Sequence, residues 1–218
     1  MTTMDRSQRT CSVCGKKSKQ TAIMSTNQFG SPDLDLRPPE MMRSTMPYWV
    51  EECPHCHYAY PSIETKVEGA EALLNELSLM DGPWMSRTGS LTKRFMTASH
   101  VAECAGQVME AAEYALNAAW DADDSQDDAS ARDCRGRAAS LLENALANEE
   151  IEADEKIGHS TRLVDIMRRS QKWDPASELA KSLLMQNPSS PIDKILEFQI
   201  EACRRKDAAC YKISDVVK

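Results

Sequence analysis

Four cysteines fall into two pairs whose spacing is typical of metal binding. Cys11 and Cys14 lie in Cys-Ser-Val-Cys-Gly-Lys, and Cys53 and Cys56 lie in Cys-Pro-His-Cys-His-Tyr. In each C-x-x-C turn the two thiolates point towards one ion, and backbone N–H groups of the turn stabilise their charge. Two such pairs supply four ligands, which complete the tetrahedral shell of Zn²⁺. The spacing therefore predicts one structural zinc ion per chain, bound by Cys11, Cys14, Cys53 and Cys56.

The second pair departs from the usual knuckle sequence. Between Cys14 and Cys53 lie 38 residues, a longer separation than is usual in a zinc ribbon. His57 stands where glycine is favoured, because the residue after the second cysteine takes a left-handed conformation that glycine adopts freely. His55 or His57 is therefore an alternative ligand to a thiolate. A redox-active dithiol, or two unrelated pairs without a metal, are the other interpretations of this pattern.

The stretch between the two pairs, residues 27–46, holds polar candidates for a second site. These candidates are Asp33, Asp35 and Arg37. Together they predict a polar site for a cation or a peptide. The alternative is that Asp33 caps a turn while Leu34 and Leu36 pack beneath the zinc ribbon.

The spacing of the other four cysteines does not indicate a second metal site. They lie at or near apolar helical positions, where a free thiol acts as a small hydrophobic side chain. They are Cys104, Cys134, Cys203 and Cys210. The sequence also contains no P-loop, G-x-S-x-G or H-E-x-x-H motif. We therefore predict no catalytic residues and expect a binding protein rather than an enzyme.

The elements that must position the zinc ligands are short and irregular. Residues 1–10 are polar, and we expect them to be frayed. Residues 11–61 are rich in proline and glycine, with strand-like sequences at 21–25 and 48–52. We assign residues 1–62 to a small zinc ribbon that contains β-structure.

The sequence of residues 63–218 is typical of helices. Apolar side chains recur at helical spacing over 91–122, with a break expected near 99–100, and again in several shorter stretches. Residues 158–188 match one tetratricopeptide repeat at the positions of Leu163, Trp173, Ala176 and Pro188. We therefore predict a mainly α fold, a tetratricopeptide-like stack of helical hairpins with the ribbon at its N-terminus.

The order of these features resembles a known bacterial family. A C-x-x-C-G-K knuckle is followed by a variable loop and by Tyr-Trp-Val-x-x-Cys-Pro-x-Cys-x-Tyr-Ala over residues 48–59, and then by helices. This pattern is similar to the family catalogued as domain of unknown function 2225. The resemblance implies a Cys₄ zinc ribbon and a helical repeat body, and it implies no particular activity. His57 departs from the glycine usual in that family.

Charge is the main guide to partners. The 218 residues carry a net charge of −8, and residues 1–60 hold seven Lys/Arg against six Asp/Glu, so the negative charge belongs to the helical part. An acidic body repels phosphate backbones, so we expect a protein or peptide partner rather than nucleic acid. We therefore predict a zinc-binding scaffold or adaptor.

Two other functions are alternatives. One is a nucleic-acid-binding ribbon that uses five cations with three aromatic residues. These residues are Lys16, Lys17, Lys19, Arg37 and Arg43 with Phe29, Tyr48 and Trp49. The other is an enzyme with a site between ribbon and helices, formed by Asp33, Asp35 or His55.

The sequence gives one indication of cellular compartment. It contains no apolar run of the roughly 20 residues that a membrane span needs and no N-terminal targeting segment. Eight cysteines, four of them in metal-type pairs, favour a reducing compartment. We expect a cytoplasmic protein without membrane contact.

Overall fold

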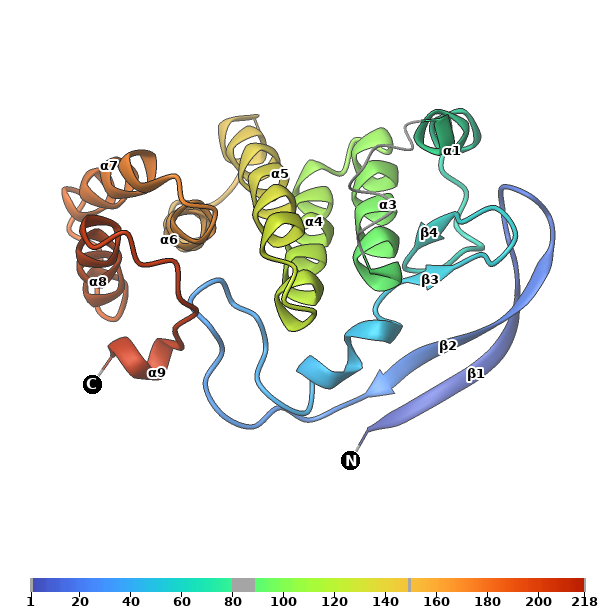
Figure 1. Ribbon diagram of the computed structural model, residues 1–218, viewed down its shortest axis with the longest axis horizontal. Helices are drawn as coiled ribbons and strands as arrows, with labels where there is room; N and C mark the ends of the chain where they lie inside the picture. The colour runs from blue at the N-terminus through green and yellow to red at the C-terminus, as the bar shows by residue number, and fades with distance from the viewer. Residues whose placement is uncertain (1, 80–88, 149, 218) are drawn as a thin grey trace.

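The computed structural model describes residues 2–79, 89–148 and 150–217, and it is mainly helical (Figure 1). The helices, in chain order, are α1 (Ala70–Leu79), α3 (Ser90–Cys104), α4 (Val108–Asp124), α5 (Asp128–Asn148), α6 (Ala153–Arg169), α7 (Trp173–Leu184), α8 (Ile192–Arg204) and α9 (Ile213–Val216). Helices α3, α4 and α5 stand side by side, and α6 is viewed end-on between α5 and α7. No helix in the described part of the chain is long and apolar enough to cross a membrane.

Small side chains allow the central helices to approach closely. Six alanines are buried in α4, the helix that packs against both α3 and α5. They are Ala111, Ala112, Ala115, Ala118, Ala119 and Ala122. Because interaxial distance depends on the side chains at the contact, alanine brings helix axes towards the short end of the usual range.

The long helix expected over 91–122 is two helices, and the break expected near 99–100 is wrong. Ser99 and His100 lie inside α3, and the chain turns at Gly106, whose φ is 76°. The Gly106 N–H donates to the Glu103 carbonyl at 2.9 Å, and the next N–H donates to the carbonyl of Ala102 at 2.9 Å. This left-handed glycine stop explains why the helix ends there.

The N-terminal residues are not frayed. Strand β1 (Thr3–Thr10) pairs antiparallel with β2 (Lys17–Ser25), with Thr10 opposite Lys17. The first C-x-x-C turn is the connection between these strands. The 21–25 strand prediction falls inside β2, whereas much of 48–52 lies outside a strand, because a 3₁₀ turn covers Arg43–Tyr48.

The second C-x-x-C turn also connects two strands. β3 (Glu51–Glu52) pairs antiparallel with β4 (Ala59–Tyr60). Tyr58, Ala59 and Tyr60 are buried in the same hydrophobic cluster as Phe95 of α3. The core therefore runs continuously from the cysteine turns into the helices, and the division of the chain at residues 62 and 63 stays a prediction.

The segment 158–188 contains the second half of α6 and all of α7. Leu163 and Ala176 are buried, with exposed fractions of 3% and 0%. A pair of helices with a small buried residue fits the expected pattern, while the tetratricopeptide assignment itself stays a prediction.

Candidate functional site

The two C-x-x-C turns meet and bring their four thiols together. The Sγ atoms of Cys11, Cys14, Cys53 and Cys56 all lie within 4.8 Å of one another. The Cys11–Cys56 and Cys14–Cys53 Sγ distances are both 3.6 Å. A tetrahedral ion with metal–sulfur bonds of about 2.3 Å needs sulfur–sulfur distances of about 3.8 Å. The predicted ligands therefore form a cage of the right size for one metal ion.

The backbone of both turns has the same hydrogen-bond pattern. In the first turn the Cys11 N–H donates to the Lys16 carbonyl and the Gly15 N–H donates to the Cys11 carbonyl, both at 2.9 Å. In the second turn Cys53 and His57 repeat these two bonds at the same distances. Each turn is thus held by its own backbone, which places its two cysteines on the same side.

Neither histidine of the second turn replaces a thiolate. His57 takes the left-handed conformation of Gly15, with φ angles of 59° and 68°. Its Nδ1 atom lies 2.9 Å from a carboxylate oxygen of Glu52. His55 is exposed, and the metal-type cluster contains cysteines alone among the described residues. The His55 and His57 alternatives are therefore not supported, and His57 adopts the backbone expected of a glycine.

The four sulfur atoms lie close enough together to influence one another's ionisation. Burial raises the pKa of the Cys11 and Cys56 thiols. Burial also acts to raise the pKa of Cys14, but the backbone N–H of Lys16 and the neighbouring thiols lower it to about 7. Sulfurs this close ionise together only when a cation lies among them. The arrangement therefore suits a metal ion that binds thiolates.

Residues 62–65 run across both turns and tie them together. The backbone N–H of Ser12 donates to the Ile63 carbonyl at 2.8 Å. The hydroxyls of Ser12 and Tyr58 both donate to the Thr65 carbonyl, at 2.9 and 2.7 Å. The cage is thus braced from outside by a segment that leads directly into the helices.

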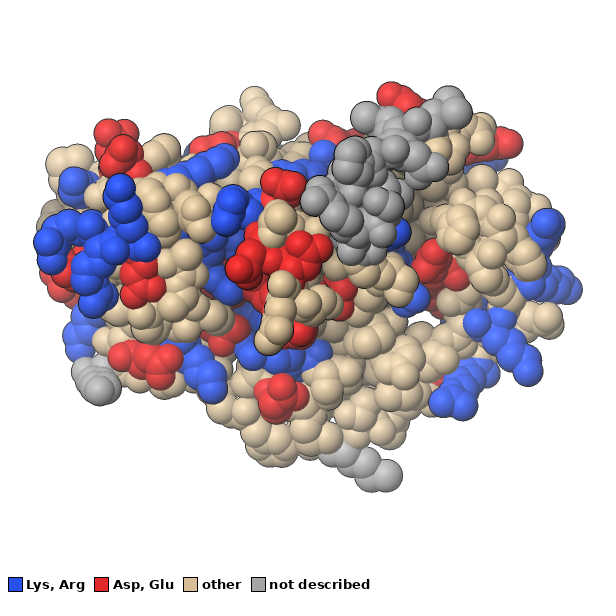
Figure 2. Space-filling model, viewed as in Figure 1, with Lys and Arg blue, Asp and Glu red and all other residues tan. Residues whose placement is uncertain are grey.

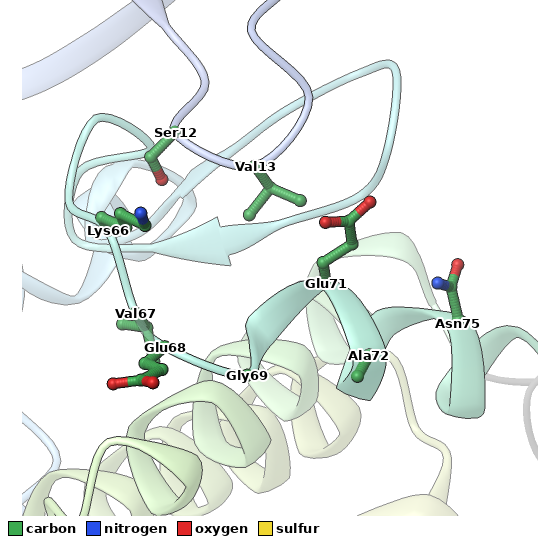
Figure 3. Close-up of a pocket in the computed structure, with 9 residues that line it drawn as sticks. All are labelled: Ser12, Val13, Lys66, Val67, Glu68, Gly69, Glu71, Ala72 and Asn75. Atoms are coloured by element: carbon green, nitrogen blue, oxygen red, sulfur yellow. The ribbon is translucent and has the colours of Figure 1, made fainter.

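A pocket of about 570 Å³ adjoins the first turn. It lies between Ser12 and Val13 of the turn and the N-terminal end of α1 (Figure 3). Its carboxylates, Glu68 and Glu71, point in different directions. They do not form the paired carboxylates of an acid–base site, so the pocket adds no reactive centre to the cage.

A second buried cluster forms around Asp35. This side chain has an exposed fraction of 0%, and its carboxylate accepts hydrogen bonds from Trp120 Nε1 at 2.8 Å and Arg169 at 2.9 Å. Arg135 lies 4.0 Å away, and Arg162 donates to the Asp35 backbone carbonyl at 2.8 Å. Burial opposes ionisation, but these arginines hold the pKa of Asp35 below its usual value.

The segment 31–37 therefore lies against α4, α5 and α6, which supply Trp120, Arg135 and Arg169. Figure 1 shows this part of the chain beneath those helices. The C-terminal segment holds its other edge, because the Leu34 N–H donates to the Tyr211 carbonyl at 2.8 Å. Leu34 is buried, as predicted, but Leu36 is 49% exposed, so the expectation that both leucines pack beneath the ribbon is wrong.

The structure does not bring together the residues predicted for a nucleic-acid patch or for an enzyme site in residues 27–46. Arg37 is 4% exposed and pairs with Asp124, and Arg43 pairs with Asp33 at 2.6 Å. Neither cation is therefore available to the nucleic-acid patch predicted with Lys16. The residues named for the enzyme site do not come together, since Asp33 pairs with Arg43, Asp35 is buried among arginines and His55 is exposed on the second turn.

Sequence reasoning missed the helical residues that surround Asp35. The one sequence feature that indicates a buried arginine is its place beside the apolar positions of a helix, as for Arg135 after Cys134. Nothing in the sequence links that arginine to a carboxylate 100 residues earlier.

Comparison with known proteins adds no relative, because no family model, no curated protein and no solved structure matches the chain. The likeness to the family of unknown function 2225 stays a prediction that rests on the two cysteine motifs.

Proposed function

We propose that the metal is one structural zinc ion. Thiolates are soft ligands that select zinc over magnesium or calcium, and four of them complete a tetrahedral shell. A shell filled by Cys11, Cys14, Cys53 and Cys56 offers no position to a substrate. The ion then stabilises the connections of two β-hairpins, which gives it a role in folding.

The zinc-stabilised chain acts, in this proposal, as a cytoplasmic adaptor for a protein partner. The observation that carries the proposal is a groove of about 590 Å³ between α5 and α7. Its floor is apolar and includes Leu146, Leu163 and Met167. Grooves of this kind bind the apolar face of an amphipathic helix.

The groove and the segment 31–37 use different faces of α6. With about 3.6 residues per turn, the pair Leu163 and Met167 lies roughly 130° around the helix from the pair Arg162 and Arg169. The arginine side is filled by the chain's own loop around Asp35. The leucine side is therefore the face that we assign to a partner.

Charge at the groove indicates the kind of helix that fits. Glu143 and Glu178 stand on its two rims, and an acidic run begins nearby at Glu150. An apolar helix face flanked by lysine or arginine is complementary to these rims. We therefore propose a basic amphipathic helix of a protein partner as the occupant.

The test compares two alanine-to-arginine variants on α5. Ala147 lines the groove and is exposed, and Ala129 is exposed at the other end of the same helix. Proteins captured from the native host by wild type and by Ala129→Arg should be lost with Ala147→Arg. The captured protein, once purified, should bind Ala147→Arg at least about tenfold more weakly, a loss of about 1.4 kcal/mol. Equal affinity for both variants would refute the groove as the partner site.

A further inference from the structure

The β1–β2 hairpin has two faces of different character. Directly opposed residues share a face, so the register places Arg6 and Thr21, Gln8 and Lys19, and Thr10 and Lys17 on one side. The cations and Gln8 on this side are exposed. The hairpin thus presents one outward face that is polar except for the Met4–Ile23 pair at its open end.

The other face is attached to the body. Arg9 pairs with Glu64 at 3.1 Å and with Glu51 at 3.7 Å. Gln20 donates to the Glu52 carbonyl at 2.8 Å. These contacts fix the orientation of the hairpin and leave its outward face uncovered.

The outward face is basic and carries no carboxylate. Arg6, Lys17 and Lys19 lie on it, and Lys16 is exposed at the tip in the first cysteine turn. No ion pair involves these four cations among the residues that the structure describes. Figure 2 shows basic side chains gathered along the edge where Figure 1 draws β1 and β2. Cations without partners on one flat face favour a polyanionic ligand.

We propose that this outward face, the basic ribbon, binds the phosphate backbone of duplex DNA. The major groove of B-form DNA is about 12 Å wide and admits a two-stranded β-ribbon. The A-form major groove of duplex RNA is too narrow for side chains to read. Single strands are bound chiefly by stacking on aromatic rings, and the basic ribbon has none. Gln8 and Thr10 lie between the cations as hydrogen-bond donors.

The overall charge predicts a protein partner rather than nucleic acid, but it averages the acidic helices with the N-terminal part. In the structure the basic ribbon is a surface separate from those helices. Screening over a Debye length of about 8 Å at physiological salt weakens repulsion from distant carboxylates. The basic ribbon is a different surface from the groove of α5 and α7, and this proposal does not depend on that one.

Fluorescence anisotropy with a labelled duplex of about 20 base pairs tests the proposal on the full-length protein. Four phosphate contacts predict a salt slope of about −3.6, so affinity should fall about 50-fold between about 50 and about 150 mM salt. The variant Arg6→Ala/Lys17→Ala/Lys19→Ala should bind at least about tenfold more weakly at the lower salt. Its salt slope should be smaller by about 2.7.

The matched control removes the same charge from the helical part of the chain. Lys156, Lys172 and Lys181 are exposed there, and their triple alanine variant should keep wild-type affinity within about twofold. Circular dichroism and metal content establish that both variants are folded. The proposal is overturned by absence of binding at about 50 mM salt or by equal weakening in the control. Tighter binding of duplex RNA or of a single strand than of duplex DNA overturns it as well.

Discussion

At the scale of single residues, Asp35 shows how a buried charge is stabilised in this protein. Its carboxylate is completely buried and contacts Trp120 and Arg169, with Arg135 nearby. A buried charge is tolerated only when it is paired and hydrogen-bonded. The segment 31–37 is therefore fixed to the helices by an ionic contact rather than by apolar burial alone.

Asp35→Ala should destabilise the protein by about 3–5 kcal/mol, because it removes a buried carboxylate and leaves the buried guanidinium groups of Arg135 and Arg169 to share Asp123. Denaturant unfolding followed by circular dichroism measures this loss. Asp5→Ala, which removes an exposed carboxylate from β1, is the control and should cost less than about 0.5 kcal/mol. A cost below about 1 kcal/mol for Asp35→Ala would show that Asp123 alone is enough to balance the charge of these arginines.

The residues most readily predicted from the sequence were the cysteines. Their chemistry is local, because each C-x-x-C turn positions two thiols through hydrogen bonds within six residues. The Asp35 cluster was not predictable in the same way. Its members are polar residues from separate helices, and only the tertiary fold brings Asp35 and Arg169 together.

At the scale of elements, both halves of the metal cage are hairpin connections. The first joins β1 to β2 and the second joins β3 to β4. Strand β1 was missed because its sequence, Thr-Met-Asp-Arg-Ser-Gln-Arg-Thr, has no apolar alternation. Its pairing follows instead from the cysteine turn and from Arg9, which contacts carboxylates of the body.

Helix α3 contains a histidine that links stability to pH. Burial, together with the Arg137 guanidinium, lowers the pKa of His100 to about 4 from its usual 6.5, although Glu103 opposes this shift. Below pH 6.5 the unfolded chain takes up a proton at His100 that the folded protein does not bind until about pH 4. The free energy of unfolding therefore falls as pH decreases through this window.

The His100→Gln variant removes this effect. Between about pH 7 and about pH 5.5, wild type should lose about 1 kcal/mol more stability than the variant. Urea unfolding of both proteins at the two pH values measures the difference. Parallel losses in wild type and variant would mean that His100 titrates normally in the folded protein.

At the scale of the whole molecule, the metal cage and the helices share one core. The buried cluster includes Cys11 and Cys53 together with Phe95 and Leu116. The mainly helical class was predictable from apolar spacing, which is repeated in every long helix. The packing of residues 27–46 across those helices was not, because a loop without periodicity carries no signal of where it lies.

Elemental analysis of the purified protein tests the central claim, a Cys₄ zinc centre, most directly. Wild type should contain about one zinc per chain, since four thiolates complete the shell. Cys14→Ser should lose most of that zinc, and Cys104→Ser, which changes an exposed thiol outside the cage, should retain it. Wild-type protein without zinc, in which all four cage thiols titrate freely in the native state, would contradict the account.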